Sequence, residues 1–230
     1  MHSIDRRSFV KGSLLAAAAF SLPAPLAAQA SASAAKPRPG AKGPGIIDTD
    51  VMLFDWPYRR LKYGGNTRAL VAKLRQHGVT QVWAGSYDAL LHKNINGVNA
   101  RLAEECRRNG EGLLLPFGTV NPGWPDWEDL RRCHEVHKMP GIRIFPSYQY
   151  VNMGAPQFAQ LLEAAGRRGM IVQIAVDMED PRVHHPSFGA MSFDTDALVA
   201  ALKAAPKTKV QLVHATNEIT DRKRTKVVQE

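Results

Sequence analysis

Three polar side chains that interrupt or end apolar, β-branched stretches could carry out chemistry in this sequence. Asp50 lies in IIDTDV, Arg143 lies in GIRIF, and His214 ends KVQLVH. A carboxylate serves as a general base where burial raises its pKa, and a histidine exchanges protons near neutral pH. A guanidinium between apolar neighbours is expected to point inward and to clamp an anion. We therefore predict that Asp50, Arg143 and His214 are catalytic residues.

Each of these residues also has a purely structural interpretation. Arg143 can form an internal salt bridge with Asp50 or Asp48, and the two aspartates can serve only to satisfy backbone amides. His214 can be a partly buried histidine at the end of a strand. The sequence alone leaves both interpretations open.

The elements that must position these residues are strands alternating with amphipathic helices. Six short apolar runs predict strands, which begin about every 30 residues, as repeated βα units do: 46–53, 80–84, 113–120, 141–145, 170–176 and 209–214. Gly78, Gly110 and Gly169 each follow a helix and precede a strand, where we expect a left-handed cap. This order predicts an α/β fold with a parallel sheet, either open and doubly wound or a barrel. No G-x-G-x-x-G follows the first strand, which argues against a nucleotide-binding open sheet.

In a barrel, the working face is built from the carboxyl ends of the strands and the loops after them. The rule places further polar and aromatic residues around the mouth that holds Asp50 and His214. We predict these as substrate-binding residues: Trp56, Asn121, Tyr148, Gln173 and Asp177.

The stretch IIDTDVM (46–52) resembles the opening strand I-I-D-x-H-x-H of the amidohydrolase-related (amidohydrolase 2-like) family of metal-dependent hydrolases and decarboxylases. LPFGTVNP, GIRIFP and RGMIV follow in the family's order, so the resemblance covers about residues 46–214. It implies a (β/α)8 TIM-barrel-like fold, here truncated to about six βα units because a polar tail follows His214. It also implies hydrolysis of a C–N or ester bond, or decarboxylation, of a small carbonyl compound.

The resemblance implies a divalent metal such as zinc, but the ligand positions have changed. Alternate strand residues share a face, so positions 48, 50 and 52 are expected to point into the barrel. Asp50 and Met52 replace the two histidines, Ala175 stands where the fifth strand supplies a ligand, and His214 remains. A thioether is a poor zinc ligand, and zinc catalysis needs about three protein ligands. We predict a degenerate metal site with no assigned metal ligand. A non-catalytic ligand-binding barrel and a truncated gene product remain alternatives.

Other patterns carry less chemistry. The histidines of HEVH (134–137) are three apart, whereas a metalloprotease H-E-x-x-H spaces them by four, so a solvated helix face is predicted. The HHP stretch (184–186) is predicted to be a loop near the mouth. Cys106 and Cys133 lack metal-ligand spacing, although an exported protein could join them in a disulfide.

The amino-terminal residues predict export to the periplasm. DRRSFVK, an apolar run and AQA form a twin-arginine signal peptide over 1–30, followed by a disordered leader over 31–45. The apolar run is too short and too rich in proline to be a stable membrane anchor. The barrel domain is predicted at 46–216 and a polar basic tail at 217–230.

The formal net charge is +9, but the basic pairs close helices and no aromatic residues interleave with them. We therefore predict no nucleic-acid partner. A small-molecule ligand is expected, and homo-oligomers can form through the open edges of the incomplete barrel.

Overall fold

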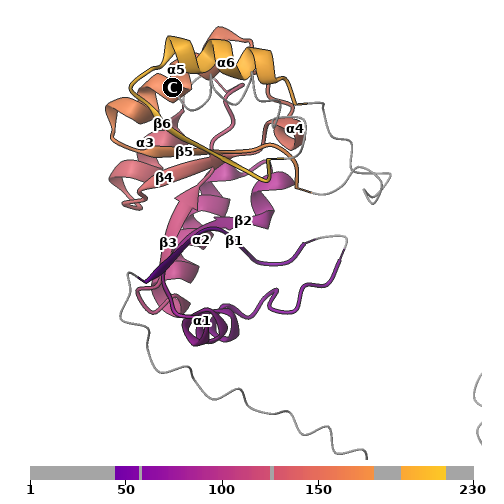
Figure 1. Ribbon diagram of the computed structural model, residues 1–230, viewed down its shortest axis with the longest axis vertical. Coiled ribbons are helices and arrows are strands. Elements are labelled where there is room, and N and C mark those ends of the chain that lie inside the picture. The colour runs from indigo at the N-terminus through magenta and orange to yellow at the C-terminus, as the bar shows by residue number, and fades with distance from the viewer. Residues whose placement is uncertain (1–44, 57–58, 125–126, 179–192, 216–230) are drawn as a thin grey trace, which may run out of the picture. The chain divides into compact units, whose positions relative to one another are not determined.

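The computed structural model describes residues 45–56, 59–124, 127–178 and 193–215. Six parallel strands form one sheet in the sequential order β1-β2-β3-β4-β5-β6 (Figure 1). Their bounds are β1 Ile46–Leu53, β2 Val79–Ser86, β3 Leu114–Gly118, β4 Gly141–Ile144, β5 Ile171–Ala175 and β6 Lys209–Val213. Each prediction of a strand is confirmed, with boundaries shifted by a few residues at most. Parallel strands in strict sequential order are typical of a (β/α) barrel, so the predicted barrel-like fold is also confirmed over the described residues.

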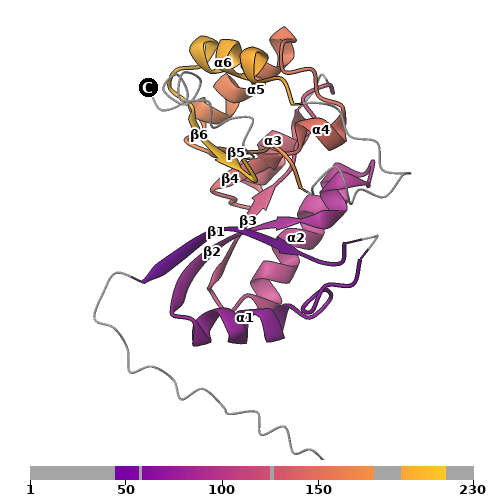
Figure 2. The same cartoon turned by 45° about the vertical axis from the view of Figure 1, so that its right-hand side comes forward.

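Helices connect the strands. They are α1 Thr67–Gln76, the short 3-10 helix η1 Tyr87–Leu90, α2 Ile95–Asn109, α3 Glu128–Glu135, α4 Pro146–Gln149, α5 Pro156–Arg167 and α6 Thr195–Ala204. In Figure 2, α1 and α2 lie beside β2 and β3, whereas α5 and α6 lie together over β5 and β6. None of the described helices is long and apolar enough to cross a membrane.

Local sequence explains where these helices begin and end. Four of them start after a side chain that accepts a hydrogen bond from a backbone N–H of the first turn, as N-caps do: Asn66 for α1, Ser86 for η1, Asn94 for α2 and Asp194 for α6. Gly78 and Gly169 have the expected positive φ after α1 and α5. The prediction for Gly110 was wrong, since its φ is −84° and Glu111 and Gly112 make the left-handed turn instead.

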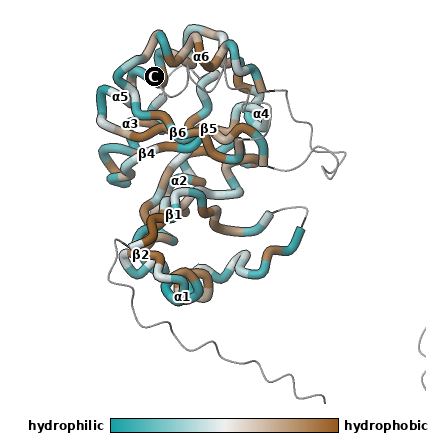
Figure 3. The backbone as a smooth tube through the Cα atoms, viewed as in Figure 1, coloured by the Kyte–Doolittle hydropathy of each residue, from teal (hydrophilic) through white to brown (hydrophobic). Residues whose placement is uncertain are grey.

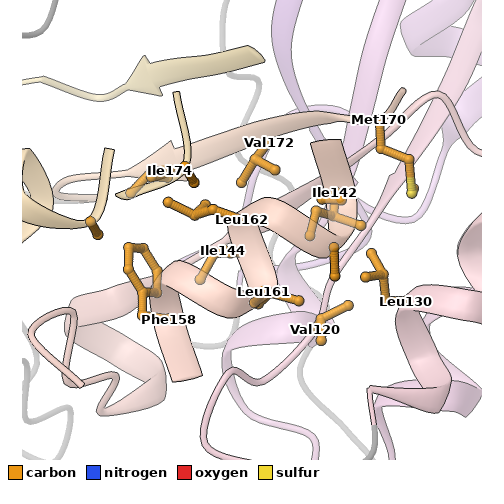
Figure 4. Packing of buried hydrophobic residues seen from close by; sticks show 14 of the residues in the cluster. Val120, Leu130, Ile142, Ile144, Phe158, Leu161, Leu162, Met170, Val172 and Ile174 are labelled. Carbon is orange, nitrogen blue, oxygen red and sulfur yellow. The ribbon is translucent and has the colours of Figure 1, made fainter. Parts of the chain in front are cut away.

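The hydrophobic core lies between the outer face of the sheet and the helices. Ile142 and Ile144 of β4 and Val172 and Ile174 of β5 pack against α5, and all four are fully buried (Figure 4). In Figure 3, stretches of brown, which mark hydrophobic residues, lie along the tube near the labels β5 and β6. Each such side chain contributes about 1.5–3 kcal/mol by leaving water. A second cluster joins β2 to α1 and α2 through Val71, Val82 and Leu102, among others.

The two cysteines belong to this outer layer. Cys106 of α2 and Cys133 of α3 are both buried and both free, so the suggested disulfide is absent from the described residues. Burial raises the pKa of each thiol to about 12. A thiol with so high a pKa is unreactive near neutral pH.

Candidate functional site

The inner face of the sheet holds a fully buried arginine. Arg143 of β4 is 0% exposed, and its three nitrogens all have partners inside the protein. Nε donates to Oε1 of Gln173 at 2.9 Å, Nη1 lies 3.1 Å from Oδ1 of Asp50, and Nη2 donates to the backbone oxygen of Thr49 at 3.1 Å. Of the two interpretations of Arg143, the internal salt bridge is the one observed, and its partner is Asp50.

Arg143 belongs to a layer of polar side chains that crosses three strands. Arg143, Gln173 and Gln211 are direct neighbours on β4, β5 and β6. Gln173 Nε2 donates to Oε1 of Gln211 at 2.8 Å and to the backbone oxygen of Thr49 at 2.7 Å. Gln211 Nε2 donates to the hydroxyl of Thr49 at 2.9 Å. Because Thr49 is on β1 and Gln211 is on β6, the sheet curves until its first and last strands meet through side chains.

A bulge in β1 turns two consecutive residues toward this interior. Asp48 pairs with Val82 and Val51 with Ala84, so Thr49 and Asp50 together face the single residue Trp83. Both side chains therefore reach inner-face partners, Thr49 at Gln211 and Asp50 at Arg143. The expected strict alternation over positions 48, 50 and 52 is corrected here, since the bulge adds Thr49. The carboxylate of Asp48 accepts a hydrogen bond from the Asp50 backbone N–H at 3.1 Å.

Asp50 also contacts His214 at the end of β6. The distance between Asp50 Oδ2 and His214 Nε2 is 3.1 Å, and the side chains are 31% and 30% exposed. Neither His214 Nε2 nor Asp50 Oδ1 has a well-aligned hydrogen bond among the described residues, so both contacts of Asp50 are defined by distance alone. The structure thus brings the three predicted catalytic residues together, with Asp50 between the other two.

The backbone at His214 is unusual. Its φ of 53° lies in the left-handed region, which costs a non-glycine residue on the order of 1 kcal/mol and is common at functional sites. Two hydrogen bonds from the end of β5 hold this turn: Val176 donates to the oxygen of Val213 at 3.0 Å, and Asp177 donates to that of His214 at 3.4 Å. The β5–β6 pairing therefore continues beyond the strands and carries His214 with it.

The pKa directions follow from these contacts. Burial by itself raises the pKa of Asp50, but the contact with His214 and the charge of Arg143 outweigh it and leave the pKa below its ordinary value. Burial lowers the pKa of Arg143, and the charge of Asp50 opposes this. Asp50 therefore lacks the raised pKa that a general base at this position would require.

The predicted substrate-binding residues lie around this centre in different settings. Gln173 is fully buried in the polar layer. Trp56 and Tyr148 are 4% and 5% exposed and belong to an apolar cluster with Ala175 and Val213 at the strand ends. The Tyr148 hydroxyl accepts a hydrogen bond from the Met178 backbone at 3.2 Å.

The other two are less buried. The Asn121 side chain accepts a hydrogen bond from the backbone of Gly123, and Asp177 lies two residues after the end of β5. The structure thus gives Gln173, Tyr148 and Asn121 hydrogen-bond partners within the chain. Substrate contact by any of the five stays a prediction.

The side chains at the expected metal positions do not fit a metal ion. In the part of the chain that the structure describes, no three His, Cys, Asp or Glu side chains are grouped so that they could hold one. Met52 directs its sulfur at Arg143 Nη1, 2.8 Å away, and Ala175 is buried in an apolar cluster. Asp50 and His214 are left as two donors, and a guanidinium already contacts one of them. The first two residues of HEVH end α3, the last two follow it, and HHP lies outside the described residues.

Sequence reasoning missed Thr49, Gln211 and Gly85. A signal for Gln211 was present, because GIRI, IVQIA and KVQLV share a polar residue at the third place and pair in register. Gly85 in β2 makes room for Arg143, since a Cβ there would lie 3.1 Å from Arg143 Nη1 and 2.9 Å from Met52 Sδ. A glycine inside a strand often marks such a close approach. Thr49 left no signal, because its position depends on the bulge.

The fold is shared with solved decarboxylases and amidohydrolases. 2,6-Dihydroxybenzoate decarboxylase from Rhizobium matches with a TM-score of 0.55 and 16% identity over 73% of this chain and 65% of that one. 5-Carboxyvanillate decarboxylase from Sphingomonas paucimobilis matches with 0.54 and 12% identity, over 73% and 67%. An amidohydrolase II matches with 0.51 and 12% identity, over 80% and 73%. At these identities the likeness shows the amidohydrolase-related fold, as the resemblance implied.

The chain thus spans just under two thirds of the Rhizobium enzyme. No protein-family model matches the sequence, and a comparison with curated proteins finds no match.

Proposed function

With the amidohydrolase-related fold as the premise, we propose that this chain is an enzyme that hydrolyses or decarboxylates a small carbonyl compound. His214 is the group that transfers protons, and Asp50 is the carboxylate that orients it. The observation that carries this proposal is the 3.1 Å contact between Asp50 and His214, in which both side chains are partly exposed. The decarboxylases and the amidohydrolase of the same fold support the choice of reaction.

The division of labour follows from charge. Both reactions need a proton at the right moment, either on the leaving group or on the carbon that loses CO₂, and imidazole is suited to deliver it near neutral pH. Asp50, whose pKa is lowered, stays ionised and orients the ring of His214 through the 3.1 Å contact. Since Nε2 faces Asp50, the second ring nitrogen, Nδ1, is left for proton exchange with a substrate. The low pKa makes Asp50 itself a weak base, so His214 is the better candidate.

Arg143 has a supporting role in this proposal. As its nitrogens are engaged within the protein, it acts on Asp50 and not on a substrate anion. This replaces the anion clamp expected from the sequence. No step of the proposed reaction passes through a metal ion, because the side chains present do not fit one.

A non-catalytic ligand-binding barrel is the second candidate. It is favoured by Met52 and Ala175, which stand at two positions where the resemblance implies ligands for a catalytic metal. Under this proposal the aromatic side chains near the strand ends, Trp56 and Tyr148, contact the ligand without turnover.

Purified protein should be tested for CO₂ release from 2,6-dihydroxybenzoate and 5-carboxyvanillate, and for hydrolysis of an aryl ester. We expect turnover that falls about 10²- to 10⁴-fold in His214→Gln. His92→Gln is the matched control, because this exposed histidine lies two residues after η1 and is not part of the proposed pair. Saturable binding without turnover would support the binding barrel, and equal activity in His214→Gln and the wild type would refute the role of His214.

A further inference from the structure

We propose that the guanidinium of Arg143 is the resident cation of this site. It occupies the place from which a divalent metal ion would have to bind Asp50, so the wild-type chain takes up no metal ion there. This inference concerns cation binding and stands independently of the proposed reaction.

The contacts of the guanidinium coincide with the expected ligand positions. Nη1 lies 3.1 Å from Asp50 Oδ1 and 2.8 Å from Met52 Sδ. Asp50 and Met52 are the two side chains at the positions where the resemblance implies metal-binding histidines. The arginine therefore contacts both of these side chains from the interior of the barrel, as a metal ion bound between them would.

The surroundings form a cradle for a guanidinium. Backbone oxygens of Thr49, Val51 and Trp83 accept from its two terminal nitrogens at 3.1, 3.4 and 3.4 Å. Gly85 lies against one of these nitrogens, because a Cβ there would be 3.1 Å from Nη1. A guanidinium has five N–H donors, and a buried one needs an acceptor for each. These backbone oxygens supply acceptors for the N–H groups of Arg143.

The arginine is also held so that it cannot swing away. Its side chain is 1% exposed, and Nε is fixed by Gln173, which is itself held by Thr49 and Gln211. A metal ion could bind Asp50 only next to the positively charged guanidinium or by displacing it. Repulsion between neighbouring cations is strong in a partly buried site, because the effective dielectric constant is far below that of water.

The side chains left to bind a metal ion are too few to overcome its repulsion from the guanidinium. Asp50 carries one negative charge, which the guanidinium already balances, and His214 is the second donor. The cation is thus part of the chain itself, and Asp50 is kept ionised without any metal being loaded.

Zinc and manganese titration of the whole purified chain, followed by calorimetry, tests this proposal. Met52→His adds a third donor side chain beside Asp50 and His214. We expect Met52→His to bind zinc no better than the wild type while Arg143 is present. In Met52→His/Arg143→Met the guanidinium is gone, and we expect one zinc ion per chain with an affinity at least about 100-fold higher. Asp50→Asn added to Met52→His/Arg143→Met is the control, because zinc that still binds to this triple variant is bound elsewhere on the chain.

Two outcomes would overturn the proposal. One is stoichiometric zinc or manganese binding by the wild type or by Met52→His that Asp50→Asn abolishes. The other is a folded Met52→His/Arg143→Met variant whose zinc affinity at Asp50 does not rise. Circular dichroism establishes folding, and Arg143→Gln replaces Arg143→Met if the latter does not fold. Met52→His/Arg143→Lys keeps a positive charge and should exclude zinc as Met52→His does.

Discussion

The two faces of the same sheet differ in chemistry. On the outer face, Ile142, Ile144, Val172 and Ile174 pack against helices in a core without charges. On the inner face, the residues between them in sequence, Arg143 and Gln173, form a network of hydrogen bonds and an ion pair. Each of these strands therefore contributes to both the apolar core and the polar network, because its side chains alternate between the two faces of the sheet.

The difference separates stability from specificity. Apolar burial on the outer face is non-directional, so it holds helices to strands but does not fix one strand opposite another. The inner face joins β1 to β5 and β6 by directed hydrogen bonds and places Asp50 beside His214. We infer that the outer face provides most of the free energy of folding and that the inner face sets the geometry of the site.

The largest effect is expected from truncation on the outer face. Leu161→Ala should lower the free energy of unfolding by about 3–4 kcal/mol, because Leu161 is fully buried and its loss leaves a cavity. Leu91→Ala is the matched control, since Leu91 is 47% exposed and should change stability by less than about 1 kcal/mol. Urea unfolding measures both. Equal losses in the two variants would contradict the assignment of the core.

A somewhat smaller effect is expected from the ion pair of the inner face. Asp50→Asn leaves the buried Arg143 charge without its partner and should cost about 3 kcal/mol near pH 7. Glu163→Gln, which breaks the exposed pair with Arg167, should cost less than about 1 kcal/mol.

The cost of Asp50→Asn should depend on pH. The pKa of Asp50 is lowered in the folded state, so its contribution is complete above the unfolded-state pKa of about 4 and is lost as the pH falls through the folded-state pKa. Urea unfolding of the wild type and Asp50→Asn between acid and neutral pH measures the difference. A difference that grows on acidification would show that the pKa is raised instead.

The smallest effect is expected where β1 meets β6. Thr49→Val and Gln211→Leu each remove one partner of a 2.9 Å hydrogen bond and should each cost about 1–2 kcal/mol. The double variant should cost less than the sum by about 1 kcal/mol. Thr80→Val paired with Gln211→Leu is the control cycle, because Thr80 bonds to the backbone of Ile46 and should show no coupling. Additive costs for Thr49 and Gln211 would mean that the two strands do not meet there.

Much of this arrangement was readable in the sequence. The six strands and the inward direction of Arg143 followed from apolar runs and period-two alternation. An ion pair of Arg143 with Asp50 or Asp48 was one of two interpretations that the sequence left open. The role of Gln211 and the space at Gly85 could have been inferred from the same strands. The unexpected position of Thr49 could not, because a bulge depends on how two strands pair.

The sequence by itself determined which elements form and which residues alternate between the two faces, because propensity and periodicity are properties of neighbouring residues. Only the tertiary structure decided that Arg143 contacts Met52 and Asp50, that His214 reaches Asp50, and that Thr49 meets Gln211. These contacts join strands far apart in the chain, and they depend on sheet curvature and one local bulge. No local pattern of residues encodes that geometry.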